Sequence, residues 1–326
     1  MNDHPPRNLG LDLVRVTEAA ALTAGRWIGR GQPEEADAAA AEAMLEAFNT
    51  LDMKGRVILG EESKLGRHSP LDSGTVLGTG YGPEMDVLVD PIDGARLLMH
   101  GRSGALAVAA VAPAGSMLAV EPAAYMEKIV VDREVGDKLV PEAMDAPAAW
   151  TLALISRLKN KPIRDIIVFM LERDRHMDLV EEIRAAGARV WMRADGDILG
   201  ALLAMEPNIG ADVLMGIGGA AEGMMAACAA HALGGAMLAR LAPQSESERQ
   251  AVAKAGLSTH KIFTQNDLVT DDDLFFVATG ITDGPLLNGV RYLGDRAETH
   301  SIILRGSTGT RRVVYAEHTI KRLFGG

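Results

Sequence analysis

The second half of the chain alternates short apolar runs with helix-forming segments, and this pattern limits the fold more than any other feature. Each apolar run is nearly continuous, which indicates a strand buried on both faces, as in parallel sheets covered by helices. The predicted strands are Asp165–Leu171, Arg189–Met192 and Asp212–Gly216, and the predicted helices are His176–Gly187, Ile198–Met205 and Ala220–Leu233. The pattern predicts an α/β fold with a parallel sheet in this half.

The first half has two helical segments followed by separated apolar runs. The helices are predicted at Leu11–Ile28 and Glu34–Phe48, and the strands at Arg56–Leu59, Val87–Val89 and Leu106–Val111, with two late strands at Asp273–Thr279 and Ser301–Leu304. The segment Asp132–Ala148 mixes charged residues, proline and alanine without a clear period, as connections between domains do. We therefore predict two halves, an α+β half over residues 1–140 and an α/β half over residues 141–326.

The charge balance of the chain argues against polyanionic partners. Lys and Arg number 33 against 44 Asp and Glu, a net charge of −11, so neither nucleic acid nor an anionic membrane is expected to bind. The single cysteine, Cys228, cannot form an internal disulfide, and its alanine-rich surroundings indicate a small core residue rather than a nucleophile. No apolar run approaches a membrane span of roughly 18 residues, and the polar N-terminus does not read as a signal peptide. We expect a cytoplasmic protein.

An acidic turn follows the predicted strand Val87–Val89. Pro91 has no N–H to donate to a ladder, so the strand is expected to stop there, and Gly94 permits a tight turn. Asp90, Asp93 and the carbonyl of Ile92 then lie on one compact turn, and these are the oxygen ligands that Mg²⁺ or Mn²⁺ prefers. The alternative is ordinary turn chemistry, for which Asp-Pro-x-Asp-Gly is also typical.

Further acids stand where strands end or helices begin. Glu61 and Glu62 follow the predicted strand Arg56–Leu59, Asp37 lies early in the second helix, and Glu222 lies at the start of Ala220–Leu233. Taken singly, each is better explained as a solvated acid. Taken together, they predict a crevice with two or three bound cations suited to phosphoryl transfer.

The glycine-rich segment from Gly216 to Ala221 has a competing interpretation. It fits the pattern G-x-G-x-x-A between a strand and a helix, which is typical of dinucleotide binding. That fold also needs an acid about 20 residues further on, at a strand end. The next acid after Glu222 is Glu246, in a polar loop, so the pattern disfavours a nicotinamide site.

The chain resembles the class II fructose-1,6-bisphosphatases of bacteria, within the lithium-sensitive sugar phosphatase superfamily. The resemblance extends from about Leu13 to about Arg312. It is carried by the segments 15–20 (RVTEAA), 29–31 (GRG), 60–61 (GE), 89–94 (VDPIDG), 125–128 (YMEK), 175–176 (RH), 195–197 (DGD), 216–220 (GIGGA), 222–223 (EG) and 278–282 (ATGIT). So many matches in the same order are specific for the family.

The resemblance implies a layered α-β-α-β-α fold with mixed sheets, and removal of the C1 phosphate of fructose 1,6-bisphosphate, a step of gluconeogenesis that needs Mg²⁺ or Mn²⁺. It also implies a homo-oligomer. The metal ligands implied by matching position are Asp37, Glu61, Asp90, the Ile92 carbonyl, Asp93 and Glu222, with Asp37, Glu61 and Asp90 also catalytic. The implied substrate-binding positions are Tyr125, Arg173, Arg175, Asp195, Asp197, Gly218 and Gly219. The first half would then bind metal, and the second would bind the sugar phosphate.

Three positions depart from the family pattern on the side where the attacking water would be activated. Ala95 replaces a threonine, Gln32 and Pro33 replace an Asp-Lys pair, and Glu62-Ser63 replaces Gly-Glu. Alanine has no proton donor or acceptor, and losing one positioned acid–base partner typically costs about 10²–10⁴-fold in rate. Three hypotheses follow: an active bisphosphatase that uses Glu62 or Asp37 as base, a sugar-phosphate-binding paralogue with little turnover, and a phosphatase for another phosphorylated sugar or polyol.

Overall fold

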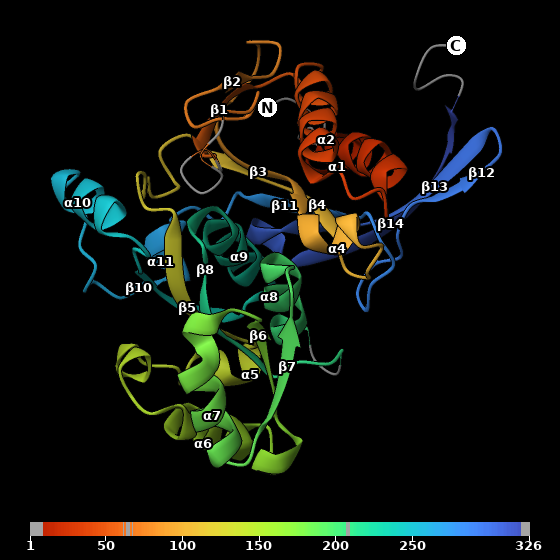
Figure 1. The fold of residues 1–326 in the computed structure, drawn as a ribbon. Coiled ribbons are helices and arrows are strands. Elements are labelled where there is room, and N and C mark those ends of the chain that lie inside the picture. The colour runs from red at the N-terminus through yellow and green to blue at the C-terminus, as the bar shows by residue number, and fades with distance from the viewer. Residues whose placement is uncertain (1–8, 61, 63–65, 67, 207–208, 321–326) are drawn as a thin grey trace.

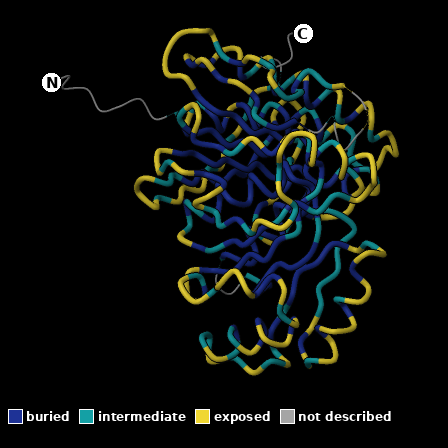
Figure 2. The backbone as a smooth tube through the Cα atoms, turned by 90° about the vertical axis from the view of Figure 1, so that its left-hand side faces the viewer, coloured by how far each residue is buried: buried dark blue, intermediate teal, exposed yellow. Residues whose placement is uncertain are grey.

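The computed structural model describes residues 9–60, 62, 66, 68–206 and 209–320. In these residues two β-sheets form separate layers, with helices outside and between them (Figure 1). Buried residues run through the middle of the molecule, and exposed residues gather at the loops (Figure 2). Within the described ranges, no helix is both long enough and apolar enough to cross a bilayer.

The first sheet draws its strands from both ends of the chain. As far as the structure describes the chain, it has eight strands, β1 (Lys54–Leu59), β2 (Val76–Leu77), β3 (Glu84–Asp93), β4 (Leu106–Pro113), β11 (Phe275–Gly280), β12 (Arg291–Leu293), β13 (Arg296–Arg305) and β14 (Thr310–Thr319). Only β1 and β3 pair in parallel among these strands. β4 lies between β3 and β11 and is buried along almost its whole length, which explains its continuous apolar sequence.

The second sheet is mixed. Its six strands in the described residues are β5 (Tyr125–Val131), β6 (Ile167–Leu171), β7 (Arg189–Arg193), β8 (Val213–Gly219), β9 (Ala236–Leu241) and β10 (Phe263–Thr264). The prediction of a parallel sheet holds for β7, β6 and β8 but is wrong for the sheet as a whole. β5, which precedes the alternating segment, pairs antiparallel with both β8 and β9. Neither β5 nor β9 was predicted as a strand. Their places in the sheet could not be predicted either, because the order of strands is fixed by packing between distant segments and not by local pattern.

Helices form three layers around the two sheets (Figure 1). The layers are α1 (Leu9–Ala24) with α2 (Pro33–Phe48) outside the first sheet, α8 (Asp197–Met205) with α9 (Ala220–Leu233) between the sheets, and α6 (Ala148–Leu158) with α7 (Met177–Ala185) outside the second. The other α-helices are α4 (Ala95–Met99), α5 (Arg133–Gly136), α10 (Glu246–Lys254) and α11 (Gln265–Leu268). The predicted α-β-α-β-α layering with mixed sheets is confirmed.

The sequence of α9 reflects its place in the central layer. Alanine and methionine occupy all sides of this helix, and nearly all of it is buried. A helix that is apolar on every side is stable only where it is covered on every side, and small alanines let both sheets approach closely. Cys228 is fully buried in this helix, and burial raises its pKa to about 12, which confirms the prediction of a core residue.

The predicted division at residue 140 describes the connectivity incompletely. The chain passes from the first sheet to the second at β5, which begins at Tyr125, and returns to the first sheet at β11, which begins at Phe275. Each sheet nevertheless has its own outer helices, and both sheets share α8 and α9. Folding of residues 1–140 and 141–326 as two separate units stays a prediction.

Gly200 tests how closely α8 packs against the second sheet. An added Cβ would overlap the ring of Phe169 and lie 2.9 Å from Leu214 Cδ1. We expect Gly200→Ala to lower the free energy of unfolding by about 1–3 kcal/mol through overpacking, measured by urea denaturation. The control is Ala38→Gly on the exposed side of α2, which should cost about 1 kcal/mol from helix propensity alone. A stabilising Gly200→Ala would show that propensity, not packing, decides this position.

Candidate active site

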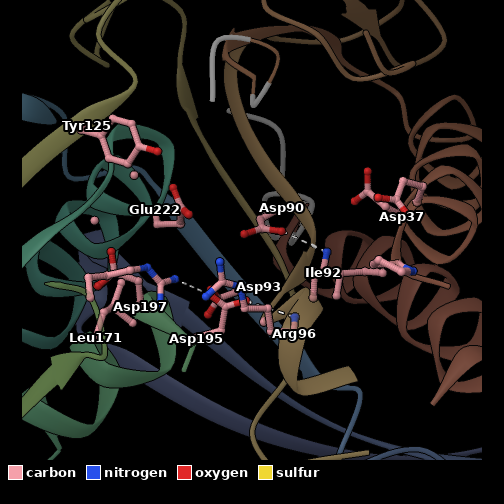
Figure 3. A pocket seen from close by; sticks show the side chains of 18 of the residues that line it. Asp37, Asp90, Ile92, Asp93, Arg96, Tyr125, Leu171, Asp195, Asp197 and Glu222 are labelled. Atoms are coloured by element: carbon pink, nitrogen blue, oxygen red, sulfur yellow. Dashed lines mark hydrogen bonds and ion pairs between the residues drawn. The ribbon is translucent and has the colours of Figure 1, made fainter. Parts of the chain in front are cut away.

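One cavity of about 440 Å³ gathers residues from both halves of the chain (Figure 3). The predicted site residues that line it are Asp37, Asp90, Ile92, Asp93, Tyr125, Arg173, Arg175, Asp195, Asp197, Gly218, Gly219 and Glu222. Of the predicted set, only Glu61 lies outside the described residues. The cavity is therefore the place where widely separated sequence motifs meet.

The acidic turn lies at the end of β3, but its backbone differs from the prediction. The strand does not stop at Pro91. It continues to Asp93, with an irregular register against β4 between Asp90 and Asp93. Such a bulge accommodates a proline, because the extra residue needs no ladder partner, and it redirects the side chains. Asp90 Oδ1 accepts a hydrogen bond from the Ile92 N–H at 3.0 Å, and Gly94 follows in the left-handed region at φ 105°.

Asp93 ties this turn to the central layer of helices. Its Oδ2 accepts hydrogen bonds from the N–H groups of Ile198 and Leu199, at 3.2 and 3.3 Å. These amides belong to the first turn of α8 and have no partner within the helix itself. A carboxylate there is also favoured by the helix dipole. The first half thus contacts the second at the point where both contribute to the cavity.

Four helices begin at this cavity. The lining residues Pro33, Ala95 and Asp197 are the first residues of α2, α4 and α8, and Gly219 immediately precedes α9. A helix N-terminus carries partial positive charge and unpaired N–H groups, and it therefore favours carboxylates and phosphates. The acids Asp37, Asp197 and Glu222 stand in the early turns of three of these helices, which explains how so many carboxylates share one cavity.

Gly218 and Gly219 are glycines because two acids pack against them. A Cβ added at Gly218 would overlap Asp197 Oδ2, and one added at Gly219 would overlap the carboxylate of Glu222. The segment does run from a strand into a helix, as a dinucleotide fingerprint requires. Gly218 and Gly219, however, leave space for the carboxylates of Asp197 and Glu222. The glycine pattern is thus explained without a nucleotide.

The basic side of the cavity comes from the residues after β6. Arg173 Nη2 lies 2.8 Å from Asp195 Oδ1, and the Arg96 N–H donates to the other carboxylate oxygen of Asp195 at 3.1 Å. Arg175 Nη2 donates to the Ile217 carbonyl at 2.7 Å, and its guanidinium lies 5.3 Å from the ring centre of Tyr125. Burial, followed by the charge of Arg173, lowers the pKa of Arg175, which remains a cation because arginine is a very strong base.

Two residues that contact residues of the site, His176 and Lys128, lie in the family segments quoted above but had no individual role assigned from the sequence. His176 is buried; its Nε2 accepts from the Ile217 N–H at 2.8 Å, so Nδ1 carries the proton and donates to the Leu171 carbonyl at 2.7 Å. Lys128 is buried beside Asp197. A lysine among the aliphatic residues of β5 was the available signal, because a buried lysine requires an acidic partner.

Two of the three departures from the family pattern fall at helix starts, and the third is Glu62-Ser63, of which Ser63 lies outside the described residues. Ala95 lines the cavity at the first position of α4, and Pro33 occupies the first position of α2, where proline is favoured. Gln32 precedes α2, and its side chain makes no capping hydrogen bond. Glu62 is not among the lining residues, and its Oε1 accepts from the Ser73 N–H at 3.1 Å. Of the two alternative bases, Asp37 is the one that lines the cavity.

The donor set fits a hard divalent cation in its chemistry. Asp90, Asp93 and Glu222 are all buried at the cavity, and buried carboxylates need compensating positive charge. Figure 3 shows the carboxylates of Asp90 and Glu222 directed into the cavity. In the described part of the chain, no three Asp, Glu, His or Cys side chains are gathered closely enough to hold an ion, and Glu61 is not part of that comparison.

Comparison with known proteins gives consistent matches over the whole chain. The family model for bacterial fructose-1,6-bisphosphatase, glpX-encoded, matches residues 7–318. A class 2 fructose-1,6-bisphosphatase of Haemophilus influenzae is 37% identical over 331 residues, which cover 98% of each chain. Two proteins from Synechococcus strains, both named D-fructose 1,6-bisphosphatase class 2/sedoheptulose 1,7-bisphosphatase, are each 34% identical over 95% of each chain.

The hydrogen bonds of His176 predict a pH-dependent contribution to stability. Burial lowers the pKa of His176, partly opposed by the hydrogen bond to the Leu171 carbonyl. The unfolded chain therefore binds a proton at higher pH than the folded chain. The contribution of His176 to the free energy of unfolding is complete above the ordinary histidine pKa of about 6.5 and is lost as pH falls below that value. The loss is no more than about 1.4 kcal/mol per pH unit.

We therefore expect the difference in unfolding free energy between wild type and His176→Gln to shrink between pH 8 and pH 5. Urea denaturation at a series of pH values measures this difference. The exposed His260→Gln is the matched control. A difference that stays constant with pH, or one that the control reproduces, would contradict the assignment of a neutral, buried His176.

Proposed function

The chain belongs to the family of bacterial fructose-1,6-bisphosphatases, and from that membership we propose that it hydrolyses the C1 phosphate ester of fructose 1,6-bisphosphate in gluconeogenesis. The products are fructose 6-phosphate and inorganic phosphate. The observation that carries the proposal is the single cavity in which buried carboxylates of the first half face arginines and helix N-termini of the second.

Phosphate binding is supported by positive groups on one side of the cavity. Arg175 presents a planar fork of N–H donors that suits phosphate oxygens, and its stacking on Tyr125 limits its freedom. The backbone after Gly218 and Gly219 leads into α9, whose first N–H groups favour an anion. We assign the substrate phosphate groups to this part of the cavity.

Sugar binding is assigned to the acids of the second half. Asp195 is fixed by Arg173 and by the Arg96 N–H, and Asp197 stands at the start of α8. A carboxylate accepts hydrogen bonds from two sugar hydroxyls without needing a particular hydroxyl orientation. Tyr125 closes this side of the cavity with a ring and a hydroxyl group (Figure 3).

Hydrolysis requires an activated water and relief of negative charge. A bound divalent cation, Mg²⁺ or Mn²⁺, supplies Lewis-acid polarisation and makes water more acidic. The groups we assign to hold it are Asp90, Asp93, Glu222, Glu61 and the Ile92 carbonyl, together with Asp37. Asp37 is also our candidate to accept the proton of the attacking water, because it lines the cavity and Ala95 offers no hydroxyl group.

Two alternatives remain testable beside the main proposal. Ala95 favours a binding protein with low turnover, because the position lies at the cavity and has no acid–base group. The names of the Synechococcus relatives make sedoheptulose 1,7-bisphosphate a second substrate to measure. The family resemblance also leads us to propose a cytoplasmic homo-oligomer with a metal-binding first half and a sugar-binding second half.

The decisive experiment is phosphate release from fructose 1,6-bisphosphate by purified protein, in the presence of Mn²⁺ or Mg²⁺. We expect wild type to release phosphate and Asp90→Asn to lose on the order of 10²-fold or more in kcat, because a buried charge at the reacting centre is removed. Wild type no faster than Asp90→Asn would refute hydrolysis. Sedoheptulose 1,7-bisphosphate and a small set of other sugar phosphates, run in parallel, identify the preferred substrate.

Ala95 has its own test. If the missing hydroxyl limits the rate, Ala95→Thr should raise kcat at least about tenfold, a conservative bound because one positioned acid–base partner typically contributes about 10²–10⁴-fold. The control is Ala95→Val, because valine has nearly the same shape as threonine but no hydroxyl group. Equal rates for wild type and Ala95→Thr would show that Ala95 does not limit the rate.

A further inference from the structure

Lys128 occupies an unusual place for a lysine. It lies in the middle of β5, and the alternation of strand side chains puts it on the same face as Met126 and Val130, which belong to the core between the two sheets. Its side chain is only 1% exposed. Lysine is almost never fully buried unless it is paired, because removing an ammonium group from water is costly.

Asp197 is the partner that compensates this charge. Lys128 Nζ lies 2.5 Å from Asp197 Oδ2, and the aspartate side chain is 6% exposed. Within the described residues, neither of these two atoms has a further hydrogen-bond partner, and no other acid forms an ion pair with Lys128. Among the described residues, Lys128 is therefore the cation that forms an ion pair with the Asp197 carboxylate.

The lysine reaches Asp197 from behind the cavity. Asp197 lines the cavity and Lys128 does not. Gly218, on the neighbouring strand β8, lies between them: a Cβ there would overlap Asp197 Oδ2 and come within 2.8 Å of Lys128 Nζ. The absent side chain leaves the space through which the ion pair forms. Lys128 can thus act on a ligand in the cavity only through the aspartate.

The same aspartate begins the helix that holds the metal side of the site. Asp197 is the first residue of α8, after Gly196 in the left-handed region at φ 92°. The next two N–H groups, of Ile198 and Leu199, bind Asp93 Oδ2. Backbone amides, and not the Asp197 side chain, bind Asp93, so the ion pair with Lys128 is separate from the contacts of Asp93.

We propose that Lys128 is a positioning residue that holds Asp197 ready to accept hydrogen bonds from the sugar hydroxyls of the substrate. This inference rests on the proposed function, and it adds a residue that does not touch the ligand itself. The affinity for the sugar, but not the affinity for phosphate, then depends on the buried ion pair between Lys128 in β5 and Asp197 in α8.

The test compares sugar binding with phosphate binding in Lys128→Met, which keeps an unbranched side chain of similar volume and removes its charge. We expect KM for fructose 1,6-bisphosphate and Kd for fructose 6-phosphate to rise on the order of tenfold, because a buried charge loses its partner. We expect kcat to change by less than about threefold, the pattern of lost ground-state binding. Kd for inorganic phosphate, measured by phosphorus NMR titration, should stay unchanged.

Matched variants separate positioning from folding. Lys159→Met removes another buried lysine, which pairs with Asp132 and Asp212 away from the cavity, and it should leave all three constants unchanged. Adding Lys128→Met to Asp197→Asn should cause no further loss of fructose 6-phosphate affinity. This double variant leaves no unpaired buried charge, so it also decides the question if Lys128→Met alone does not fold.

The outcomes are distinct. Equal weakening of phosphate and fructose 6-phosphate binding, an equal effect of Lys159→Met, or additive losses in the double variant would overturn the role of Lys128. Wild type that binds fructose 6-phosphate but releases no phosphate would refute hydrolysis and still leave the binding measurements to decide the lysine. Wild type that binds neither sugar phosphate nor fructose 1,6-bisphosphate would refute both.

Discussion

The arrangement of this protein depends on the convergence of helix N-termini on one cavity. α2, α4, α8 and α9 all begin there, although they come from three different layers or connections of the fold. The first-turn N–H groups and the partial positive charge of these helices favour the burial of acids such as Asp93 and Glu222 at the cavity. The same field favours a phosphate group. Without this convergence, the carboxylates would repel one another and the two sheets would have no common site.

Charge is compensated differently on the two sides of the cavity. On the first-sheet side, Asp93 is held by backbone N–H groups of α8. On the second-sheet side, Asp195 and Asp197 are held by the side chains of Arg173 and Lys128. Backbone donors leave the net negative charge of a carboxylate in place, whereas a paired cation cancels it. The first side therefore suits a cation, and the second suits neutral sugar hydroxyls.

The substitutions that distinguish this chain from the family pattern leave that division intact. Ala95 and Pro33 stand at helix starts, where neither disturbs the backbone and proline is favoured. The groups that hold charge, from Asp90 to Glu222, are all present among the described lining residues. The residues that hold charge and the residues that depart from the family pattern are therefore different, so substrate binding and turnover can be measured separately.

The sequence by itself determined most helices and the acidic turn, because these are written in local periodicity and in short motifs, whereas the layered class and the set of residues that line the cavity were implied by the resemblance to a family. It did not determine that β5 inserts antiparallel beside β8, that β3 continues past Pro91 through a bulge, or that Lys128 meets Asp197. The β5–β8 pairing and the Lys128–Asp197 ion pair join residues about 70 to 90 positions apart, and the bulge depends on how β3 pairs with β4, so no local pattern encodes these features. Only the tertiary structure could show why Gly218 and Gly219 lack side chains, since the acids that occupy the space are placed by packing.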